Sequence, residues 1–252
     1  MEFTGIRGQV WRAVVQPESV TVGLVAGDTA ALLVDTGTSP AQGAELRAAA
    51  ARVTDRPLRH VVVTHHHWDH ADGLPAFNDS ETIAHESSGL PVTTALSSIA
   101  VRDLGGLTVE IAHFGPAHTQ GDLIVAVPAA GVIFAGDLVE TSGPPQFDET
   151  SDLDGWVKSL DSLYALLKPT TLVVPGHGDV ADAWDVGHQR AGLAAIWGQA
   201  EWAFYQGIAE RDVYTHDNLQ WPWDETTATT AIALAYQELE RRPKPKTQLP
   251  LL

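Results

Sequence analysis

The sequence has no cysteine among its 252 residues. This absence excludes disulfides, iron–sulfur clusters, thiol nucleophiles and thiolate ligands, so any bound metal has to be held by nitrogen and oxygen. Long apolar runs are absent too. No stretch reaches the ~18 apolar residues that suggest a membrane-spanning helix, and residues 1–15 lack the apolar run of a signal peptide. The sequence therefore predicts a cytoplasmic protein without a membrane partner.

Positive charge is scarce in this chain. The sequence has 15 Lys and Arg against 32 Asp and Glu, which gives a formal net charge of −17 at pH 7. Affinity for nucleic acids depends mainly on cations that contact phosphates, and the basic cluster 241–246 stands near the end of the sequence. We therefore expect a small-molecule substrate and no nucleic-acid partner.

Strands and helices alternate along the first two thirds of the sequence. Apolar patterning predicts an opening antiparallel meander and then a helix that Ser39 caps and Pro40 begins. The predicted strands are 8–15, 20–26, 30–35, 60–64, 81–84, 107–113, 122–127, 132–135 and 171–174, with a further helix at 153–167. Two similar halves of this kind predict an α/β (α+β) fold in which two sheets pack face to face under covering helices.

Beyond Asp182 the apolar spacing is helical only, and a last helix is predicted from about residue 224. The segment contains three glycines, Gly187, Gly192 and Gly198. Each costs about 1 kcal/mol relative to Ala in a helix, so the first of these helices is expected to be broken. No change in composition requires a separate domain. We predict a core over residues 1–182 and a helical C-terminal extension over residues 183–252 that packs on the same domain.

One segment concentrates side chains that bind metals. His65, His67, Asp69 and His70 directly follow the predicted strand 60–64. On a turn that leaves a strand, residues 65 and 67 can face one point, and residues 69 and 70 a neighbouring point, so the spacing suits two metals better than one. Three further candidates follow other strands, each beside a Gly or Pro that permits a tight turn. They are His118, Asp137 and His177.

Less specific interpretations exist for several of these residues. Histidines 65–67 could be a surface cluster, and Asp137 or His177 alone would more often be a turn or loop residue. Asp137 and His177 indicate a metal site only when all the candidates are taken together. The same alternation predicts that His66 points away from the metals. The other histidines have no such grouping and are interpreted as ordinary: His60, His85, His113, His188 and His216.

With these motifs the chain resembles the metallo-β-lactamase superfamily, whose signature Thr-His-x-His-x-Asp-His appears here as residues 64–70. Further motifs match in the family's order at 35–37, 115–122, 136–137 and 175–178, so the resemblance covers at least residues 9–180. It implies an αββα sandwich with a dinuclear site along one edge. It assigns His65, His67 and His118 to the first metal and Asp69, His70 and His177 to the second, with Asp137 bridging both.

The resemblance also implies the chemistry of the site. A hydroxide between two metals would be the nucleophile, Asp69 would steer its proton, and Asp69 and Asp137 are the candidate catalytic residues. Nitrogen and carboxylate ligands favour two zinc ions, with iron or manganese as alternatives. His67 replaces the Glu of the family's di-iron flavoproteins, and the lactamase subclass with only His and Asp ligands lacks a residue like Asp137. The first comparison disfavours an oxygen or nitric oxide reductase, and Asp137 favours the glyoxalase II, lactonase and esterase-like branches.

The predicted activity is hydrolysis of a small ester, lactone or thioester. A β-lactam hydrolase and a phosphodiesterase or nuclease of the same superfamily are the alternatives, and the negative net charge disfavours a nuclease. A non-catalytic binding protein would be expected to lack ligands, and none is missing. Glyoxalase II itself is disfavoured because residues 183–240 contain only Arg190 and Arg211 as cations.

Three features are expected around this site, although no residue is assigned to the substrate. The loop 140–155 follows Asp137 and is expected near the mouth. Thr119 and Asp122 are expected to support the turn at His118. The C-terminal part is rich in tryptophan, with Trp197, Trp202, Trp221 and Trp223. These rings could wall an apolar pocket, form a contact in a homodimer, or pack their helices on the sandwich.

Overall fold

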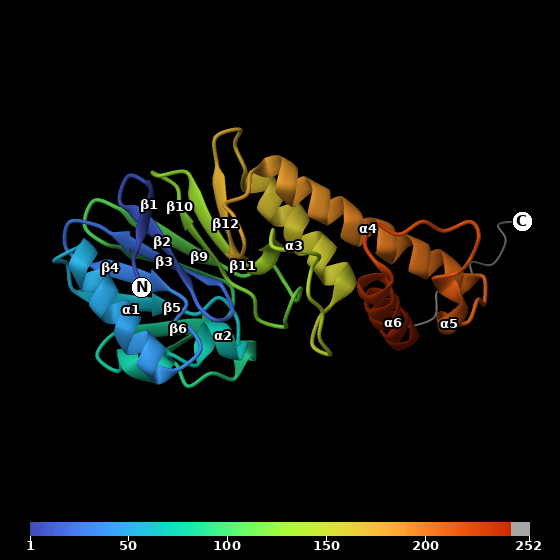
Figure 1. Cartoon of the computed structure of the whole chain (residues 1–252), viewed down its shortest axis with the longest axis horizontal. Coiled ribbons are helices and arrows are strands. Elements are labelled where there is room, and N and C mark those ends of the chain that lie inside the picture. The colour runs from blue at the N-terminus through green and yellow to red at the C-terminus, as the bar shows by residue number, and fades with distance from the viewer. Residues whose placement is uncertain (243–252) are drawn as a thin grey trace, which may run out of the picture.

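The strands form one twelve-stranded sheet that is folded into two facing halves, as Figure 1 shows. This is a computed structural model, and it describes residues 1–242. The strands are β1 (Thr4–Arg7), β2 (Val10–Val15), β3 (Val20–Ala26), β4 (Ala31–Val34), β5 (Leu58–Val62), β6 (Glu81–His85), β7 (Thr94–Leu96), β8 (Ile99–Asp103), β9 (Thr108–Ala112), β10 (Ile124–Val127), β11 (Val132–Glu140) and β12 (Leu172–His177). Their order is β7-β6-β5-β4-β3-β12-β11-β10-β9-β8, with β2 paired to β3 and β1 to β2. The halves join where His177 of β12 pairs with Val20 of β3.

Apolar side chains between the two halves form the centre of the sandwich. Neighbouring residues of a strand point to opposite faces, so in β3 Val25 lies in the layer between the halves whereas Leu24 lies in an outer layer. Ile111 of β9 and Phe134 of β11 enter the central layer from the other half. Because a slip of one residue would move these side chains from the central layer to an outer layer, their packing fixes the strand register and with it the position of the strand ends.

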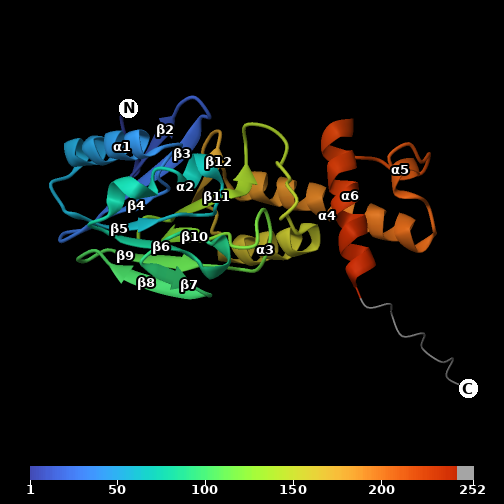
Figure 2. The ribbon, with the colours of Figure 1, turned by 90° about the horizontal axis from the view of Figure 1, so that it is seen from below.

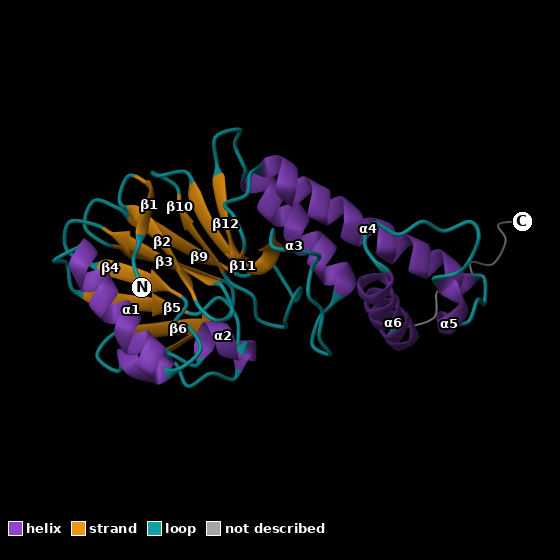
Figure 3. Cartoon of the chain, in the orientation of Figure 1, coloured by secondary structure: helices purple, strands orange, loops and turns teal. Residues whose placement is uncertain are grey.

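Helices cover both outer faces of the folded sheet, as Figure 3 shows. They are α1 (Pro40–Val53), α2 (Trp68–Ala71), α3 (Leu153–Leu166), α4 (Ala183–Tyr205), α5 (Glu210–Val213) and α6 (Glu225–Arg241), with the 3₁₀ turns η1 (Leu74–Phe77) and η2 (Glu86–Ser88). Leu46 of α1 packs on the first half, and Trp156 of α3 and Ile196 of α4 belong to the cluster on the second half. The predicted αββα sandwich is therefore confirmed.

The expected break in the helix beyond Asp182 is wrong, because α4 runs without interruption for 23 residues. Two of its glycines face aromatic rings of neighbouring segments. A Cβ at Gly192 would lie 2.7 Å from the Trp223 ring, and one at Gly187 would lie 3.3 Å from the Tyr164 ring. The absence of a side chain allows close packing there, and this packing offsets the cost of about 1 kcal/mol that each glycine brings to a helix.

The C-terminal helices extend away from the sheet, as Figure 2 shows. One apolar cluster nevertheless runs from Ile133 of β11 through Trp156 of α3 to Ile196 of α4 and Tyr236 of α6. The helices therefore share a continuous core with the second half of the sandwich. The division at residue 182 stays a prediction.

The basic cluster at the end of the chain is only partly described. Arg242, which follows α6, forms an ion pair with Asp154 of α3. Lys244 and Lys246 of that cluster lie outside the described residues. None of the helices within residues 1–242 is long and apolar enough to cross a membrane.

Candidate metal centre

The predicted metal-binding residues meet where several strands end, at one edge of the folded sheet. The segment 65–70 leaves β5 and continues into α2, while His118 lies in the loop between β9 and β10. Asp137 belongs to β11, and His177 is the last residue of β12. Their ligand atoms form two groups, within each of which all of them lie within 4.8 Å of one another. The first group is His65, His67, His118 and Asp137, and the second is Asp69, His70 and His177.

Two backbone features aim Asp137 into this edge. The register between β11 and β12 shifts around Gly136, whose φ of 53° lies in the left-handed region that glycine tolerates. On the neighbouring strand, a Cβ at Gly176 would lie 1.8 Å from Oδ1 of Asp137. Glycine is therefore required at 176 to leave room for the carboxylate, which explains the Gly-Asp and Pro-Gly-His motifs.

The first group is built around three ring nitrogens. Nδ1 of His67 lies 3.1 Å from Nε2 of His65 and 3.0 Å from Nε2 of His118. Oδ2 of Asp137 lies 3.7 Å from Nε2 of His65 and 3.6 Å from Nε2 of His118. The His65 and His118 side chains are almost fully buried. Three nitrogens and one carboxylate oxygen therefore converge on one point.

The second group lies directly beside the first. Nε2 of His177 is 3.2 Å from Oδ2 of Asp69 and 3.4 Å from Nε2 of His70. Nε2 of His70 is also 3.2 Å from Oδ1 of Asp137. Oδ2 of Asp137, which faces the first group, also lies 3.7 Å from Nε2 of His177. The Asp137 carboxylate therefore lies between the two groups.

The outward nitrogen of each of these five imidazoles has a hydrogen-bond partner of its own. The pairs are His65 with Thr64 Oγ1 at 3.0 Å, His67 with Asp148 Oδ2 at 2.7 Å, His70 with Asp35 Oδ2 at 2.8 Å, His118 with Gln146 O at 3.1 Å and His177 with Glu18 O at 3.1 Å. The Thr64 hydroxyl donates to Asp35 and so accepts from His65. Because all five partners accept, each outward nitrogen carries a hydrogen, which in a neutral imidazole leaves the inward nitrogen with a lone pair.

The inward atoms suit positive ions. Neutral imidazole nitrogens that both carry lone pairs cannot donate to each other, yet those of the first group stand 3.0–3.1 Å apart. Oδ1 of Asp137 is buried and has no hydrogen-bond partner within residues 1–242, and such buried unsatisfied atoms are rare. Imidazole nitrogens and carboxylate oxygens are ligands of zinc and related divalent metals. These residues therefore fit bound divalent metal ions.

The sequence of the chain matches one family model. The family model described as the metallo-beta-lactamase superfamily matches residues 15–90 and 84–177. The chain belongs to the metallo-β-lactamase superfamily. The prediction of this superfamily from the ordered motifs is confirmed, and the matched residues carry both ligand groups.

Several relatives in the superfamily have curated activities. The chain is 35% identical over 128 residues to a hydroxyacylglutathione hydrolase of Ruegeria pomeroyi, covering 48% of each protein. It is 28% identical over 144 residues to a type 2 metallo-beta-lactamase of Bacillus cereus, covering 52% of this chain and 54% of the relative. It is 29% identical over 197 residues to the alpha subunit of a 2,4-dinitroanisole O-demethylase of Nocardioides, covering 68% and 56%. The chain thus spans about half the length of the curated relatives it matches.

Solved structures agree with the superfamily fold. A metallo-beta-lactamase from Pontibacter korlensis matches with a TM-score of 0.68 at 22% sequence identity, covering 77% of this chain and 98% of that chain. The similarity at this level of identity concerns the sandwich alone.

The protein shifts the pKa values of the two groups in different directions. Burial lowers the pKa of His65 well below its usual value and lowers that of His118 to about 4. Burial also opposes protonation of His70, but Asp137 and Asp35 outweigh it and raise the pKa of His70 well above its usual value. Burial alone would raise the pKa of Asp137, yet His70 and His65 hold it well below its usual value. Without metal, the second group therefore carries a proton on His70, whereas His65 and His118 of the first group stay neutral.

Two hydrogen-bond partners of the ligand histidines were not predicted from the sequence. Asp35 accepts hydrogen bonds from the Thr64 backbone and hydroxyl, at 2.7 and 2.9 Å, as well as from His70. Its place in the motif 35–37 was the only signal. Asp148 accepts from His67, and its place in the loop 140–155 was the only signal for it.

Asp122 and His66 are neighbours of the proposed ligands but belong to neither ligand group. Asp122 accepts from the backbone and the hydroxyl of Thr119, at 2.8 and 2.9 Å, and so supports the turn after His118 as predicted. His66 belongs to neither of the two groups that surround Asp137, although it lies near His67 and Asp148.

A pocket of about 530 Å³ opens onto both groups. It is lined by Glu18, His67, Trp68, Asp69, His118, Asp137, Glu140, Ser142, Gln146, Phe147, Asp148 and His177. The loop 140–155 therefore supplies part of its wall, as predicted. Trp68, half exposed, and Phe147 provide aromatic surface beside the carboxylates.

The tryptophans of the C-terminal helices lie elsewhere. Trp197, Trp221 and Trp223 belong to or pack on the apolar cluster of α3, α4 and α6, and Trp202 is exposed. None of these four lines the pocket at the metal centre. Helix packing therefore describes Trp197, Trp221 and Trp223. The prediction that the tryptophans wall this pocket is wrong, and a contact in a homodimer stays a prediction.

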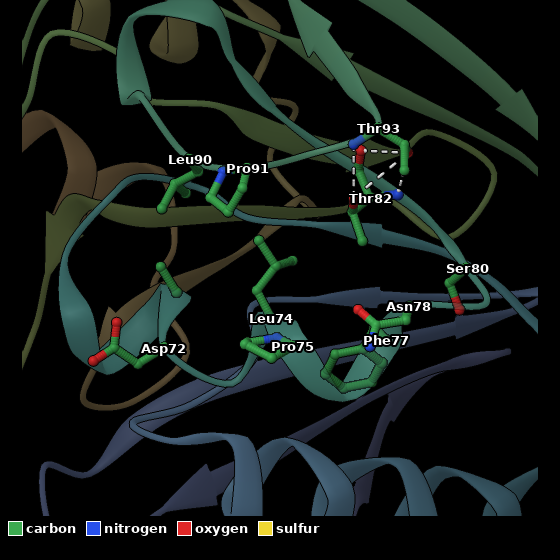
Figure 4. Close-up of a pocket in the computed structure, with 11 residues that line it drawn as sticks. Asp72, Leu74, Pro75, Phe77, Asn78, Ser80, Thr82, Leu90, Pro91 and Thr93 are labelled. Carbon is green, nitrogen blue, oxygen red and sulfur yellow. Dashed lines mark hydrogen bonds between the residues drawn. The ribbon is translucent and has the colours of Figure 1, made fainter.

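A second pocket, of about 400 Å³, lies beside α2 and η1 (Figure 4). Leu74, Phe77 and Leu90 give it an apolar lining. Thr82 and Thr93 bond to each other, each backbone N–H donating to the other hydroxyl at 2.9 Å. None of the clustered metal-binding residues lines it, so we place the chemistry in the pocket at the metal centre.

Proposed function

We propose that the chain is a dinuclear metallohydrolase. His65, His67 and His118 would hold one ion, Asp69, His70 and His177 the other, and Asp137 would bridge them. The observation that carries this proposal is the set of five imidazoles whose outward nitrogens are hydrogen-bonded and whose inward nitrogens converge around Asp137. Zinc is the proposed ion because these donors suit it, with iron and manganese as alternatives.

The chemistry divides between the metals and the chain. Bound divalent ions lower the pKa of a water to near 7 and polarise a carbonyl oxygen. The chain positions these ions and handles the proton. Burial alone would raise the pKa of Asp69, but His177 and His70 lower it overall, so this carboxylate stays ionised. Asp69 would therefore accept a hydrogen bond, through a carboxylate oxygen, from the attacking water and orient its proton.

We propose a small ester, lactone or thioester as the substrate. The Ruegeria relative is named a hydroxyacylglutathione hydrolase, and an acylglutathione is a thioester. Trp68 and Phe147 give the pocket an apolar surface against which an apolar group can pack. A polyanionic substrate is disfavoured by the net charge of −17. A β-lactam hydrolase is the second candidate, because the chain is 28% identical to the Bacillus cereus metallo-beta-lactamase.

A hydrolytic panel on zinc-loaded protein tests this function. It should contain aryl esters, lactones, thioesters, a chromogenic cephalosporin and phosphodiesters, with His118→Ala protein as the blank for contaminating esterase. We expect an ester, lactone or thioester to be cleaved with the highest kcat/KM. A phosphodiester preferred by about tenfold, which equals about 1.4 kcal/mol in transition-state binding, would instead assign a phosphodiesterase. A dominant cephalosporin would assign the second candidate.

Replacement of Asp148 by Ala should weaken metal binding. The carboxylate fixes the tautomer and the orientation of His67 through a 2.7 Å hydrogen bond, and loss of such outer partners typically costs about 10- to 100-fold in metal affinity. Competition with a chromogenic chelator would measure the change. Asp148→Asn keeps an oxygen that can accept from His67 and should lose less affinity than Asp148→Ala. Unchanged affinity in both variants would show that His67 does not depend on this contact.

A further inference from the structure

The pocket at the metal centre has an unusual balance of charge. Five of its lining residues are carboxylates, namely Glu18, Asp69, Asp137, Glu140 and Asp148. Within residues 1–242, no lysine or arginine lines it. Two divalent ions would supply four positive charges against these five negative ones, so the loaded pocket would remain slightly negative even before a hydroxide binds.

Two of these carboxylates, Glu18 and Glu140, have no role in holding the proposed metals. Both flank His177: its Nδ1 donates to the backbone carbonyl of Glu18 at 3.1 Å, and Glu140 at the end of β11 is its strand partner. Oε1 of Glu140 accepts from the Ser142 backbone and hydroxyl, at 2.8 and 2.7 Å. These contacts fix the Glu140 carboxylate at the pocket wall, whereas Glu18 is held there by its backbone carbonyl and has an exposed side chain.

A nearby arginine, Arg12, contacts other groups. Arg12 donates to the carbonyl of Gly178 at 3.2 Å and pairs with Asp179 at 3.5 Å. It does not line the pocket. An anionic group on the part of a substrate that lies away from the metals would therefore meet Glu18 and Glu140 and find no lysine or arginine among the lining residues within 1–242. Such a contact costs binding energy because like charges repel and their interaction grows in a partly desolvated pocket.

We propose that Glu18 and Glu140 make this pocket select against anionic substrates, so that the substrate is an uncharged or cationic ester, lactone or thioester. This inference rests on the proposed function and narrows its substrate class. Trp68 and Phe147 provide faces on which an apolar or cationic group can lie. The carboxylates of the pocket thus discriminate between substrates by charge before the acyl group is attacked.

A series of three thioacetates with different ends tests the proposal. The thiol part ends in trimethylammonium, in the isosteric tert-butyl group, or in a carboxylate. We expect the carboxylate compound to have a kcat/KM about tenfold or more below that of the tert-butyl compound at low salt. The difference should shrink between ~0.01 M and ~1 M salt, where the screening length falls from ~30 Å to ~3 Å.

Variants assign the effect to the two residues. The double change Glu18→Gln and Glu140→Gln should raise kcat/KM for the carboxylate compound relative to the tert-butyl compound by about fivefold. Glu45→Gln, at an exposed position of α1, makes the same chemical change on another element and should leave the ratio unaltered. An unaltered ratio in the double variant, with folding verified by circular dichroism, would overturn the assignment.

A binding measurement separates this inference from the proposed function. The corresponding amides, which resist hydrolysis, can be titrated calorimetrically into zinc-loaded protein, and the carboxylate amide should bind most weakly. If no thioacetate, and no ester or lactone of the hydrolytic panel, is cleaved faster than by His118→Ala protein, the proposed function fails while the amide affinities still test the charge selection. If thioacetates are cleaved and the anionic one is preferred, the function stands and the inference is overturned.

Discussion

Replacement of Asp137 by Ala should abolish almost all hydrolytic activity, with kcat/KM reduced by more than the roughly 10- to 100-fold that loss of an outer partner causes. One oxygen of Asp137 faces the first ligand group and the other faces His70 of the second. The variant therefore loses a contact to both proposed ions at once. Elemental analysis should show the metal content falling below the two equivalents expected for the unaltered protein, and kinetics on the same preparation should show the loss of activity.

His66→Ala is the matched control for this substitution. His66 adjoins two of the proposed ligands in the sequence but is in neither group around Asp137. Its removal should change kcat/KM only a few-fold, below the roughly 10- to 100-fold range of an outer partner. Equal losses in the two variants would show that the alternate histidines were assigned wrongly.

Acidification should remove the two metals in two steps, the second group losing its ion first. Asp69 raises the pKa of His177 despite burial, and the pKa of His70 is raised as well. Protons therefore compete for the second group below these raised values. His65 and His118, with lowered pKa values, stay available to metal until the pH approaches the value of about 4 for His118. Metal content after dialysis between about pH 8 and about pH 5 should show a one-metal plateau.

Single-ligand variants identify the ion that remains on this plateau. At about pH 6, between the usual pKa of His and the acidic limit, His177→Ala protein should keep close to one equivalent, whereas His118→Ala protein should keep less. Loss of both metals in one step, or the reverse order in these variants, would contradict the prediction. In metal-free protein, the raised pKa of His70 contributes stability that is present below its unfolded value of ~6.5 and is lost as the pH rises through the folded value.

The ligand candidates could be predicted because they depend on strand ends. Parallel neighbours such as β4, β5 and β6 bring their carboxyl ends to one edge, so a histidine that follows an apolar strand has a predictable place. Asp148 has no such anchor. It lies in a loop whose path depends on the bonds from Ser151 to the carbonyl of His118 and from Gln120 to Thr150, and no local pattern encodes these contacts.

The fold was predictable where residues are buried on a regular period, and less so at its margins. The cap at Ser39, which accepts from the backbone of Gln42 at 3.3 Å, follows directly from the sequence. The strands β1, β7 and β8 did not, because they are short or partly exposed and end the sheet or its side branch. The unbroken α4 depends on Trp223 and Tyr164, which lie far from its glycines in the sequence.

The outward hydrogen bonds of the five imidazoles bear on how the protein is assembled. Asp35 alone joins the end of β4 to Thr64 and to His70, and none of these contacts uses an atom proposed to bind an ion. We therefore expect the polypeptide to reach its final shape first and to capture metal afterwards. The ions found in a preparation would then reflect the medium in which the finished protein was kept, and dialysis against another divalent metal would exchange them without refolding.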